Sequence, residues 1–300
     1  MSKYKQEIEL ARKLVKKAAG ITEWFRETGF RTLEKRDHSP VTLADYASQI
    51  FINYNLRKVF PGDQIFAEEV IDELSSSQEE IIQRCFHDQK IDIKNLKSTL
   101  NYRGNLSNRQ WTIDPVDGTK GFVEHLSYSI GISLVVNSEP IVSAIAAPNY
   151  DDDGLAVFSA ELGQGAEASF GGRKFHPVHV SSQKQLKNAR VCISLHNLSD
   201  ATLSFLNKIG IKESNRLSMD GMGKFCKIAD GSYDFYTHLN RSKMYSWDFC
   251  PGDLLVREAG GFSTDISGKK LQFKEKICEI TAPGYVFSNE HLHKEILSFF

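Results

Sequence analysis

Residues 111–122 of the chain read WTIDPVDGTKGF. The first three residues are aromatic or β-branched, which is typical of the end of a buried strand. Pro115 fixes its own φ and has no backbone N–H, so we expect the chain to leave the strand there. Two carboxylates, Asp114 and Asp117, would then converge on one strand exit, where α/β proteins commonly place their chemistry. Taken alone, the stretch also fits an acidic turn whose aspartates cap backbone N–H groups.

Two helices are expected upstream of this stretch. Apolar residues at helical spacing over residues 4–29 predict an amphipathic helix that ends at Gly29. Thr42 is a suitable N-cap for a second helix that runs to about Phe60. Asp45 stands at the N3 position, where it can close a capping box, so its local pattern fits a cap as well as a functional carboxylate.

Residues 64–67 are expected to form a short buried strand that delivers two adjacent acids, Glu68 and Glu69. Acids at the end of an apolar run indicate either a functional site or a solvated sheet edge. Residues 72–110 are polar, and we interpret them as a surface insertion with a helix near residues 78–86.

The residues after the central stretch predict an antiparallel sheet. Its β-rich runs are separated by short turns and span residues 128–136, 140–148, 154–160 and 165–170. The acidic run at 151–153 and the glycines at 163–165 fall in turns between these strands. We therefore expect a solvated turn at 151–153, and the strand-to-helix geometry of a dinucleotide loop is missing at 163–165.

From about residue 174 the pattern changes to alternating strands and helices, as in a second α/β unit. The side chains of this part that can carry chemistry are His196, Lys224, His238 and Asp248. Asp248 is expected at a helix entrance, where a carboxylate also interacts favourably with the helix dipole, so a cap is an alternative role. We expect two subdomains, an α+β unit over residues 1–172 with the metal site and an α/β unit over residues 173–300 with substrate-binding residues.

Composition restricts the class of protein. The chain has 300 residues, a net charge of -1 and 41% hydrophobic residues, which argues against a broad nucleic-acid-binding surface. No apolar run approaches the ~20 residues of a membrane helix, and the start of the chain lacks the apolar core of a secretory signal. The cysteines form no CxxC pair and are expected to be reduced thiols in a cytoplasmic protein: Cys85, Cys192, Cys226, Cys250 and Cys278.

Several acids stand at the ends of predicted elements: Asp45, Glu68, Asp114, Asp117 and Asp248. Carboxylates gathered at one point repel one another unless cations neutralise them, and oxygen ligands without nearby histidine or cysteine clusters favour Mg²⁺. Magnesium ions suit the hydrolysis of a phosphate ester, since they activate water and stabilise the leaving oxygen. Thr119, oriented by Asp45, could align that water or accept its proton.

Sequence blocks along the chain resemble the signature blocks of the inositol monophosphatase superfamily, whose members are Mg²⁺-dependent, lithium-sensitive phosphatases. The blocks are SPVTLADYASQ (39–49), FAEE (66–69), WTIDPVDGTKGF (111–122) and SWDFCPGDLLVREAGG (246–261). They occur in the order of the family and cover the chain from end to end. Within the superfamily, the first and third blocks are most similar to the 3′(2′),5′-bisphosphate nucleotidases, which convert adenosine 3′,5′-bisphosphate to AMP.

The resemblance implies a layered α-β-α-β-α sandwich fold and two or three Mg²⁺ ions as cofactors, with inhibition by Li⁺. It implies a small-molecule substrate: adenosine 3′,5′-bisphosphate, its sulfated form or inositol 1,4-bisphosphate. The alternative function is that of an inositol monophosphatase or an inositol polyphosphate 1-phosphatase with the same metal chemistry. We expect no nucleic-acid polymer and no membrane as a partner, and a monomer or a dimer.

The resemblance also implies roles for individual residues. The metal ligands would be the carbonyl of Val116 and the carboxylates of Glu68, Asp114, Asp117 and Asp248. Glu69 would act nearby through water. Asp45 and Thr119 would form the pair that activates the nucleophilic water, while Gly118 and Thr119 would offer backbone N–H groups to the scissile phosphate.

The predicted substrate contacts depart from the pattern of the nucleotidases. His196 and Lys224 fall where those enzymes have a histidine near the nucleotide and a lysine beside the other phosphate. His238 stands where they usually have an arginine or a lysine, and Gly221 stands where they commonly have a serine. Histidine does not reproduce the two-pronged grip of arginine on phosphate, so these departures concern nucleotide binding and leave the metal chemistry untouched.

Two other functions fit parts of the pattern. Aspartate-nucleophile phosphatases use a DxDGT strand exit, from which DPVDGT differs by one residue, and they place it early in the chain. A binding protein with an idle site would keep its carboxylates at a cost in stability, because buried acids without a metal are unfavourable. We therefore expect an enzyme that hydrolyses a phosphate ester with Mg²⁺.

Overall fold

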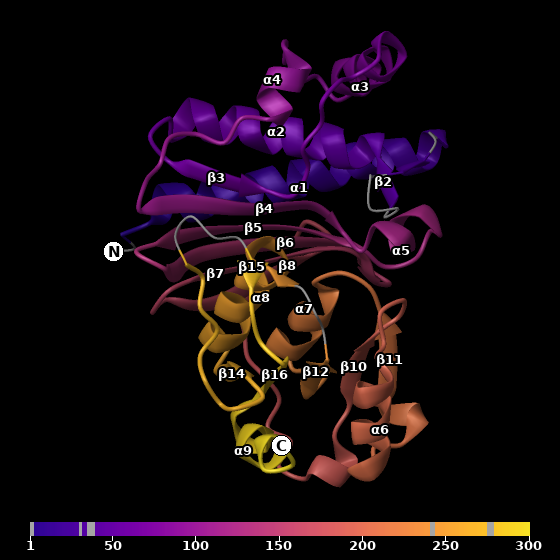
Figure 1. Ribbon diagram of the computed structural model, residues 1–300, viewed down its shortest axis with the longest axis vertical. Coiled ribbons are helices and arrows are strands. Elements are labelled where there is room, and N and C mark those ends of the chain that lie inside the picture. The colour runs from indigo at the N-terminus through magenta and orange to yellow at the C-terminus, as the bar shows by residue number, and fades with distance from the viewer. Residues whose placement is uncertain (1–2, 30–31, 35–39, 241–243, 275–278) are drawn as a thin grey trace.

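The computed structural model describes residues 3–29, 32–34, 40–240, 244–274 and 279–300. Residue 39 of the first sequence block and Cys278 lie outside these ranges. The chain stacks into layers in the order helices, large sheet, helices, small sheet, helices (Figure 1). The predicted α-β-α-β-α sandwich is confirmed.

The first layer contains two helices that cover one face of the large sheet, α1 (Lys5–Thr28) and α2 (Leu43–Val59) (Figure 1). α1 ends at the predicted glycine, since Gly29 is left-handed with φ 70°. α2 begins at the predicted cap, because Thr42 and Asp45 form a capping box in which Thr42 N donates to Asp45 Oδ2 at 2.8 Å.

The large sheet has the strand order β3-β4-β5-β6-β7-β8-β9. The strands are β3 (Gln64–Ala67), β4 (Arg109–Asp117), β5 (Ser129–Val136), β6 (Glu139–Asp151), β7 (Gly154–Glu161), β8 (Gly165–Phe170) and β9 (His176–Val178). β3 is parallel to β4, and every later pair is antiparallel, as predicted for residues 128–170. Both faces are covered: Ile130 and Ile132 belong to the core below α1, whereas Ile145 and Phe158 belong to the core on the other side.

Residues 72–110 are more than the predicted surface insertion. They form α3 (Ser76–Asp88), which confirms the expected helix, and α4 (Leu96–Leu100). Ile82 of α3 and Leu100 of α4 are fully buried in the same core as α1 and α2. The prediction was wrong on this point because polar residues dominate the segment, while its few apolar residues lie on one helix face.

The central layer contains α7 (Gly223–Ala229) and α8 (Ser246–Glu258), which lie between the two sheets (Figure 1). α8 packs against strands of both sheets. α8 begins at Ser246, which places Asp248 at the helix entrance, as expected. Asp248, at the third helical position, accepts a hydrogen bond from Tyr245 N at 3.1 Å and closes the first turn.

The small sheet has the strand order β11-β10-β12-β16-β14. Its strands are β10 (Val191–Ser194), β11 (Arg216–Met219), β12 (Phe235–Leu239), β14 (Gly261–Asp265) and β16 (Gly284–Asn289). β10 is parallel to both β11 and β12, so the carboxyl ends of these three strands share one edge. The outer layer consists of α6 (Asp200–Lys208) and α9 (Glu290–Leu297) (Figure 1).

Shorter elements complete the described chain. α5 (Thr119–Val123) follows β4 directly, and 3-10 turns cover Leu186–Asn188 and Glu213–Asn215. Two small ladders pair β1 (Thr32–Glu34) with β2 (Pro40–Thr42), and β13 (Met244–Tyr245) with β15 (Glu279–Ile280).

Several expectations from composition can be compared with the fold. The described ranges contain no helix that is both long and apolar enough to cross a membrane. The cysteines of the described ranges are buried free thiols, as expected of core residues: Cys85, Cys192, Cys226 and Cys250. The division into subdomains between residues 172 and 173 stays a prediction.

Two helical glycines give a matched test of the packing. A Cβ at Gly252 of α8 would lie 2.2 Å from Phe225 Cδ2, whereas a Cβ at Gly20 of α1 would meet Gln89 Oε1 at 3.7 Å, an ordinary contact. Gly20→Ala should raise the free energy of unfolding by about 0.5–1 kcal/mol, because alanine favours a helix. Gly252→Ala should lower it by about 1–3 kcal/mol, because the core becomes overpacked. Denaturant unfolding measures both, and a stabilising Gly252→Ala would contradict the packing of Phe225 on α8.

Candidate active site

β4 carries the central stretch as far as Asp117. Its pairing with β5 is interrupted after Asp114 and resumes where Asp117 pairs with Ser129. The strand therefore does not end at Pro115, as the sequence predicts, but becomes irregular there, because proline has no N–H to offer the ladder. Across this irregularity the carboxylate oxygens of Asp114 and Asp117 lie within 4.8 Å of each other.

Hydrogen bonds within and around the turn hold its backbone. Ser48 Oγ of α2 donates to the Pro115 carbonyl at 3.0 Å, and Val116 N donates to Asp114 Oδ1 at 3.1 Å. Thr119 Oγ1 donates to the Val116 carbonyl at 3.1 Å. These bonds satisfy backbone groups that are unpaired where the β4–β5 ladder is interrupted, so the turn has a defined shape.

Carboxylates from three parts of the chain meet at this turn, and we call them the acid cluster: Glu68, Asp114, Asp117 and Asp248. Glu68 follows β3, and its N–H bonds to the Ile113 carbonyl at 3.2 Å, which places it beside Asp114. Asp248 comes from the first turn of α8, and its carboxylate lies within 4.8 Å of those of Asp114 and Asp117 in a group that could hold a metal ion. The structure brings these predicted residues together, and their role as ligands stays a prediction.

Asp114 lies at the electrostatic centre of the acid cluster. The residue is 1% exposed, and this burial raises the pKa of its carboxyl group well above the usual value. The neighbouring carboxylates raise the pKa further: Glu68, Asp117 and Asp248. A cation bound among these groups would remove both penalties, because it would neutralise the repulsion and replace the lost hydration.

Asp45 forms the predicted cap and also faces Thr119. It is fully buried at the start of α2, where its Oδ2 accepts hydrogen bonds from Thr42 N at 2.8 Å and Thr42 Oγ1 at 2.7 Å. Its Oδ1 lies 3.5 Å from Thr119 Oγ1 across the turn. The cap therefore fixes one oxygen of Asp45 and leaves the other directed at Thr119.

Glu69 is buried, so the acid pair 68–69 does not lie on a solvated edge. Gln49 of α2 clamps its backbone: Glu69 N donates to Gln49 Oε1 at 2.9 Å, and Gln49 Nε2 donates to the Glu69 carbonyl at 2.6 Å. Arg103 Nη2 donates to the same carbonyl at 2.6 Å. These bonds fix the segment that leads out of β3 and thereby position Glu68 as well.

His196 follows β10 and lies between two carboxylates that the sequence analysis did not predict. Its Nδ1 hydrogen-bonds Asp220, and its Nε2 lies 3.0 Å from Glu124 Oε2. The hydrogen bond to Asp220 is the main reason that the pKa of His196 is raised above its usual value, and Glu124 raises it further. Since Glu124 follows α5 and Asp220 follows β11, His196 connects the two sheets of the molecule.

Lys224 lies at the start of α7 and is buried. Its ammonium donates to the Gly221 carbonyl at 2.7 Å and to the Met219 carbonyl at 3.4 Å. It also lies 5.4 Å from the centre of the Tyr236 ring, a distance suited to a cation–π contact. Lys224 thus holds the loop between β11 and α7, beside Asp220.

Gly221 has a physical reason to be glycine in this chain. Its φ of 73° is left-handed, and a Cβ there would lie 2.6 Å from Ser129 Oγ and 2.7 Å from the Asp117 carbonyl oxygen. A serine at this position would require both Ser129 of β5 and the backbone of Asp117 in β4 to shift. The close packing of this loop on β4 and β5 therefore favours glycine at position 221 of this chain.

His238 lies in β12 and is buried, with its ring stacked on Tyr285 at a centroid distance of 5.9 Å. Tyr285 in turn packs edge-on against Phe249 of α8 at 4.4 Å. His238 is therefore part of the aromatic core between the sheets, close to the shared edge of the parallel strands. Its role in substrate binding stays a prediction.

Sequence reasoning missed the residues that join the two sheets here. Asp220 N donates to Ser127 Oγ at 2.8 Å, and Met222 N donates to Ser129 Oγ at 2.6 Å. The signal that could have revealed Asp220 is its place after a predicted strand and before a glycine, as for Asp117. Glu124 follows a short helix and carries no comparable local signal.

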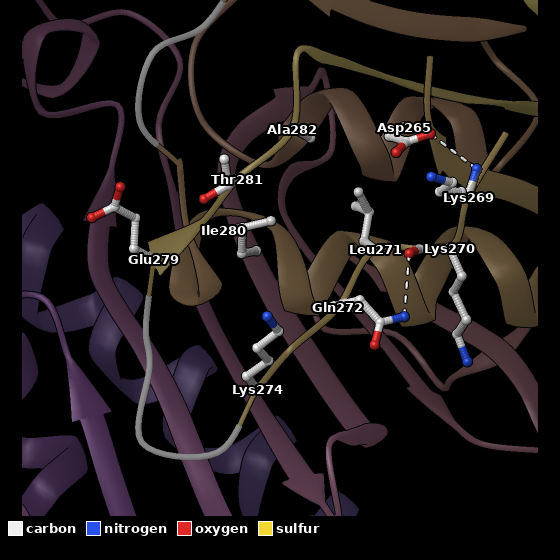
Figure 2. Close-up of a pocket in the computed structure, with 10 residues that line it drawn as sticks. All are labelled: Asp265, Lys269, Lys270, Leu271, Gln272, Lys274, Glu279, Ile280, Thr281 and Ala282. Atoms are coloured by element: carbon white, nitrogen blue, oxygen red, sulfur yellow. Dashed lines mark hydrogen bonds between the residues drawn. The ribbon is translucent and has the colours of Figure 1, made fainter. Parts of the chain in front are cut away.

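A separate hollow of about 750 Å³ lies between residues 269–274 and 279–282 (Figure 2). Figure 2 shows Lys274 and Ile280 directed into the space between these two segments. The described residues that line the hollow include none of the acid cluster. The acid cluster therefore lies outside this hollow, at the end of β4.

Comparison with known proteins agrees with this geometry. The model of the inositol monophosphatase family matches residues 3–298. A 3′(2′),5′-bisphosphate nucleotidase of Schizosaccharomyces pombe is 30% identical over 89% of this chain and 87% of that protein. A 3′(2′),5′-bisphosphate nucleotidase of Emericella nidulans is 29% identical over 98% of this chain and 97% of that protein.

Solved structures share the fold at lower sequence identity. An IMPase of Thermotoga maritima has a TM-score of 0.72 and 23% identity, covering 98% of this chain and 96% of that chain. The extragenic suppressor protein suhB of Bartonella henselae has a TM-score of 0.72 and 20% identity, covering 98% of this chain and 97% of that chain. Since the family match spans nearly the whole sequence, the chain belongs to the inositol monophosphatase family and is a phosphatase that acts on small phosphate esters.

Proposed function

We propose that this protein is a Mg²⁺-dependent phosphomonoesterase that hydrolyses the 3′-phosphate of adenosine 3′,5′-bisphosphate to give AMP and phosphate. The observation that carries the proposal is the acid cluster, in which buried Asp114 is surrounded by other carboxylates. The choice of substrate is supported by relatives named 3′(2′),5′-bisphosphate nucleotidase that align with nearly the whole chain. An Arabidopsis thaliana relative, 27% identical over 98% of this chain, is named 3′,5′-bisphosphate nucleotidase 2.

The donor set of the acid cluster fits Mg²⁺, because its ligand atoms are all carboxylate oxygens. The residues proposed to hold two or three ions are Glu68, Asp114, Asp117, Asp248 and, through its carbonyl, Val116. That carbonyl accepts one hydrogen bond from Thr119 and keeps a second lone pair. When bound, the ions would activate water and neutralise charge on the phosphate. Li⁺ inhibition and an outer role for Glu69 belong to the same proposal.

Asp45 and Thr119 are proposed to orient the attacking water. The Thr119 hydroxyl has one hydrogen, which is within reach of the Val116 carbonyl at 3.1 Å and of Asp45 Oδ1 at 3.5 Å. When the hydroxyl turns to Asp45, Thr119 can give this proton to the carboxylate while it accepts a proton from the water. Because the capping box fixes Asp45, the base does not have to be ordered during the reaction. The N–H groups of Gly118 and Thr119 stand at the start of α5 and are proposed to contact the scissile phosphate.

The second half of the chain is proposed to recognise the rest of the nucleotide. His196 and Lys224 follow parallel strands of the small sheet, and they bring positive charge towards the turn that carries the acid cluster. His238 is proposed as a further contact near the same edge. We thus propose that residues 1–172 set most of the reaction and that residues 173–300 set the substrate.

The proposed setting is a cytoplasmic enzyme. Free, buried thiols at Cys85, Cys192, Cys226 and Cys250 support a reducing compartment.

Replacing Asp114 tests how much the acid cluster lowers the stability of the metal-free protein. Because folding raises the pKa of Asp114, the folded metal-free protein binds more protons than the unfolded one between the usual carboxyl pKa and the raised one. Its stability therefore falls as pH rises through that window. Asp114→Asn removes this loss, so the metal-free variant should melt a few degrees above the parent at pH 8, since about 1 kcal/mol corresponds to about 2–4 °C. Mg²⁺ should raise the melting temperature of the parent and barely change that of the variant.

Asp234→Asn is the matched control for this experiment. Asp234 is also fully buried, but it accepts hydrogen bonds from Arg190 N at 2.6 Å and Arg190 Nη2 at 3.1 Å. Its replacement breaks an ion pair, so this variant should melt below the parent and keep the Mg²⁺-dependent rise. A parent protein that shows no rise with Mg²⁺ would refute the acid cluster as a metal site.

Phosphate release from a substrate panel tests the reaction and the substrate. With Mg²⁺, kcat/KM for adenosine 3′,5′-bisphosphate should exceed that for inositol 1-phosphate and inositol 1,4-bisphosphate by about tenfold or more, a ratio equal to about 1.4 kcal/mol of transition-state binding. Removing Mg²⁺ or introducing Asp114→Asn should reduce kcat by about 10²-fold or more. A preference for an inositol ester would reassign the substrate, and a trapped aspartyl-phosphate would overturn hydrolysis by water.

A further inference from the structure

His196 lies between one buried and one exposed carboxylate. The side chain of Asp220 is 7% exposed and that of Glu124 is 53% exposed, while the imidazole between them is 21% exposed. A charged hydrogen bond inside the protein contributes more than an exposed ion pair, which water screens. The bond to Asp220 is therefore the durable one, and the contact with Glu124 is easily exchanged.

Asp220 is itself anchored on several sides. Its Oδ1 accepts from His196 N at 3.3 Å while its other oxygen bonds the imidazole Nδ1, so one carboxylate holds both the backbone and the ring. Its own N–H donates to Ser127 Oγ at 2.8 Å. Gly121 permits this approach, because a Cβ there would lie 3.1 Å from Asp220 Oδ2 and 2.3 Å from the Ser127 carbonyl oxygen.

The two carboxylates determine which ring nitrogens of His196 carry a hydrogen. Ionised carboxylates only accept hydrogen bonds, so both ring nitrogens of His196 carry a hydrogen when Asp220 and Glu124 face them. Nδ1–H is committed to Asp220. Nε2–H points to Glu124, at a position where an oxygen of a phosphate group would accept the same hydrogen.

We propose that Asp220 is a positioning residue that presents the Nε2–H of cationic His196 to the substrate, and that Glu124 occupies the place of an anionic substrate group until the substrate displaces it. This inference rests on the proposed role of His196 in substrate binding. A neutral hydroxyl competes poorly with a carboxylate for an imidazolium, whereas a phosphate competes well. The contact thus selects phosphate esters that carry a second anionic group.

Histidine NMR of the substrate-free enzyme tests the role of Asp220 directly. With ¹⁵N-labelled histidine, and with His196→Gln to assign the signals, both ring nitrogens of His196 should be protonated at pH 7.5. In Asp220→Asn the ring should lose one proton at that pH, because the main partner of the cation is gone. In Glu124→Gln it should keep the Nδ1–H. An unchanged His196 signal in Asp220→Asn would overturn the positioning role.

Steady-state kinetics test the displacement of Glu124. Asp220→Asn should raise KM for adenosine 3′,5′-bisphosphate by about 10- to 100-fold with kcat nearly unchanged. Glu124→Gln should lower KM by about two- to fivefold, because an exposed competitor is removed. With adenosine 3′-monophosphate, which lacks the second phosphate, both changes should be much smaller. Glu213→Gln, which removes an exposed acid from the turn Glu213–Asn215, is the control and should leave KM unchanged.

The outcomes separate this inference from the proposed function. A raised KM in Glu124→Gln, or a loss of kcat at constant KM in Asp220→Asn, would overturn the inference. Because Glu124 is exposed, Glu124→Gln tests the inference even if a thermal melt shows that Asp220→Asn is poorly folded. A parent enzyme without phosphatase activity would refute the proposed function, while the NMR signature would still decide whether Asp220 controls His196.

Discussion

Repulsion among the carboxylates around Asp114 is the constraint that the site has to meet. The ionised form of Asp114 is disfavoured by burial and by the acids beside it, yet the fold holds these groups together. It does so through strand pairing and through backbone N–H groups that donate to the carboxylates. The β3–β4 ladder places Glu68, and the first turn of α8 places Asp248. A site built in this way attracts a cation for the same reason that it is unfavourable without one.

The second requirement is that the two sheets meet at the acid cluster. The loop between β11 and α7 lies against β4 and β5, and the serine hydroxyls of Ser127 and Ser129 accept hydrogen bonds from its backbone. α8 contributes Asp248 to the cluster and its body to the core between the sheets. The two sheets are therefore joined beside the acid cluster by backbone contacts as well as by side chains.

Local patterns were sufficient where the interaction is local. Thr42 and Asp45 are three positions apart and form the expected cap, and Gly29 ends α1 because its own backbone is left-handed. Local propensity gave the wrong strand end at Pro115, because pairing with β5, a contact between distant parts of the chain, continues the strand to Asp117. The approach of Asp248 to Asp114 followed from resemblance to a family and not from spacing. The contact of His196 with Glu124, 72 positions away, had no sequence signal at all.

Gly221 couples the loop between β11 and α7 to the turn at the end of β4. Any side chain at this position meets Ser129 Oγ at 2.6 Å and the Asp117 carbonyl oxygen at 2.7 Å. Removing the serine hydroxyl relieves only the first clash, so the backbone of Asp117 must move as well. A substitution in the loop between β11 and α7 is thereby transmitted to a residue of the acid cluster. The loop between β11 and α7 and the turn of β4 therefore form one packing unit, in which a change at Gly221 also requires an adjustment at Ser129 and at Asp117.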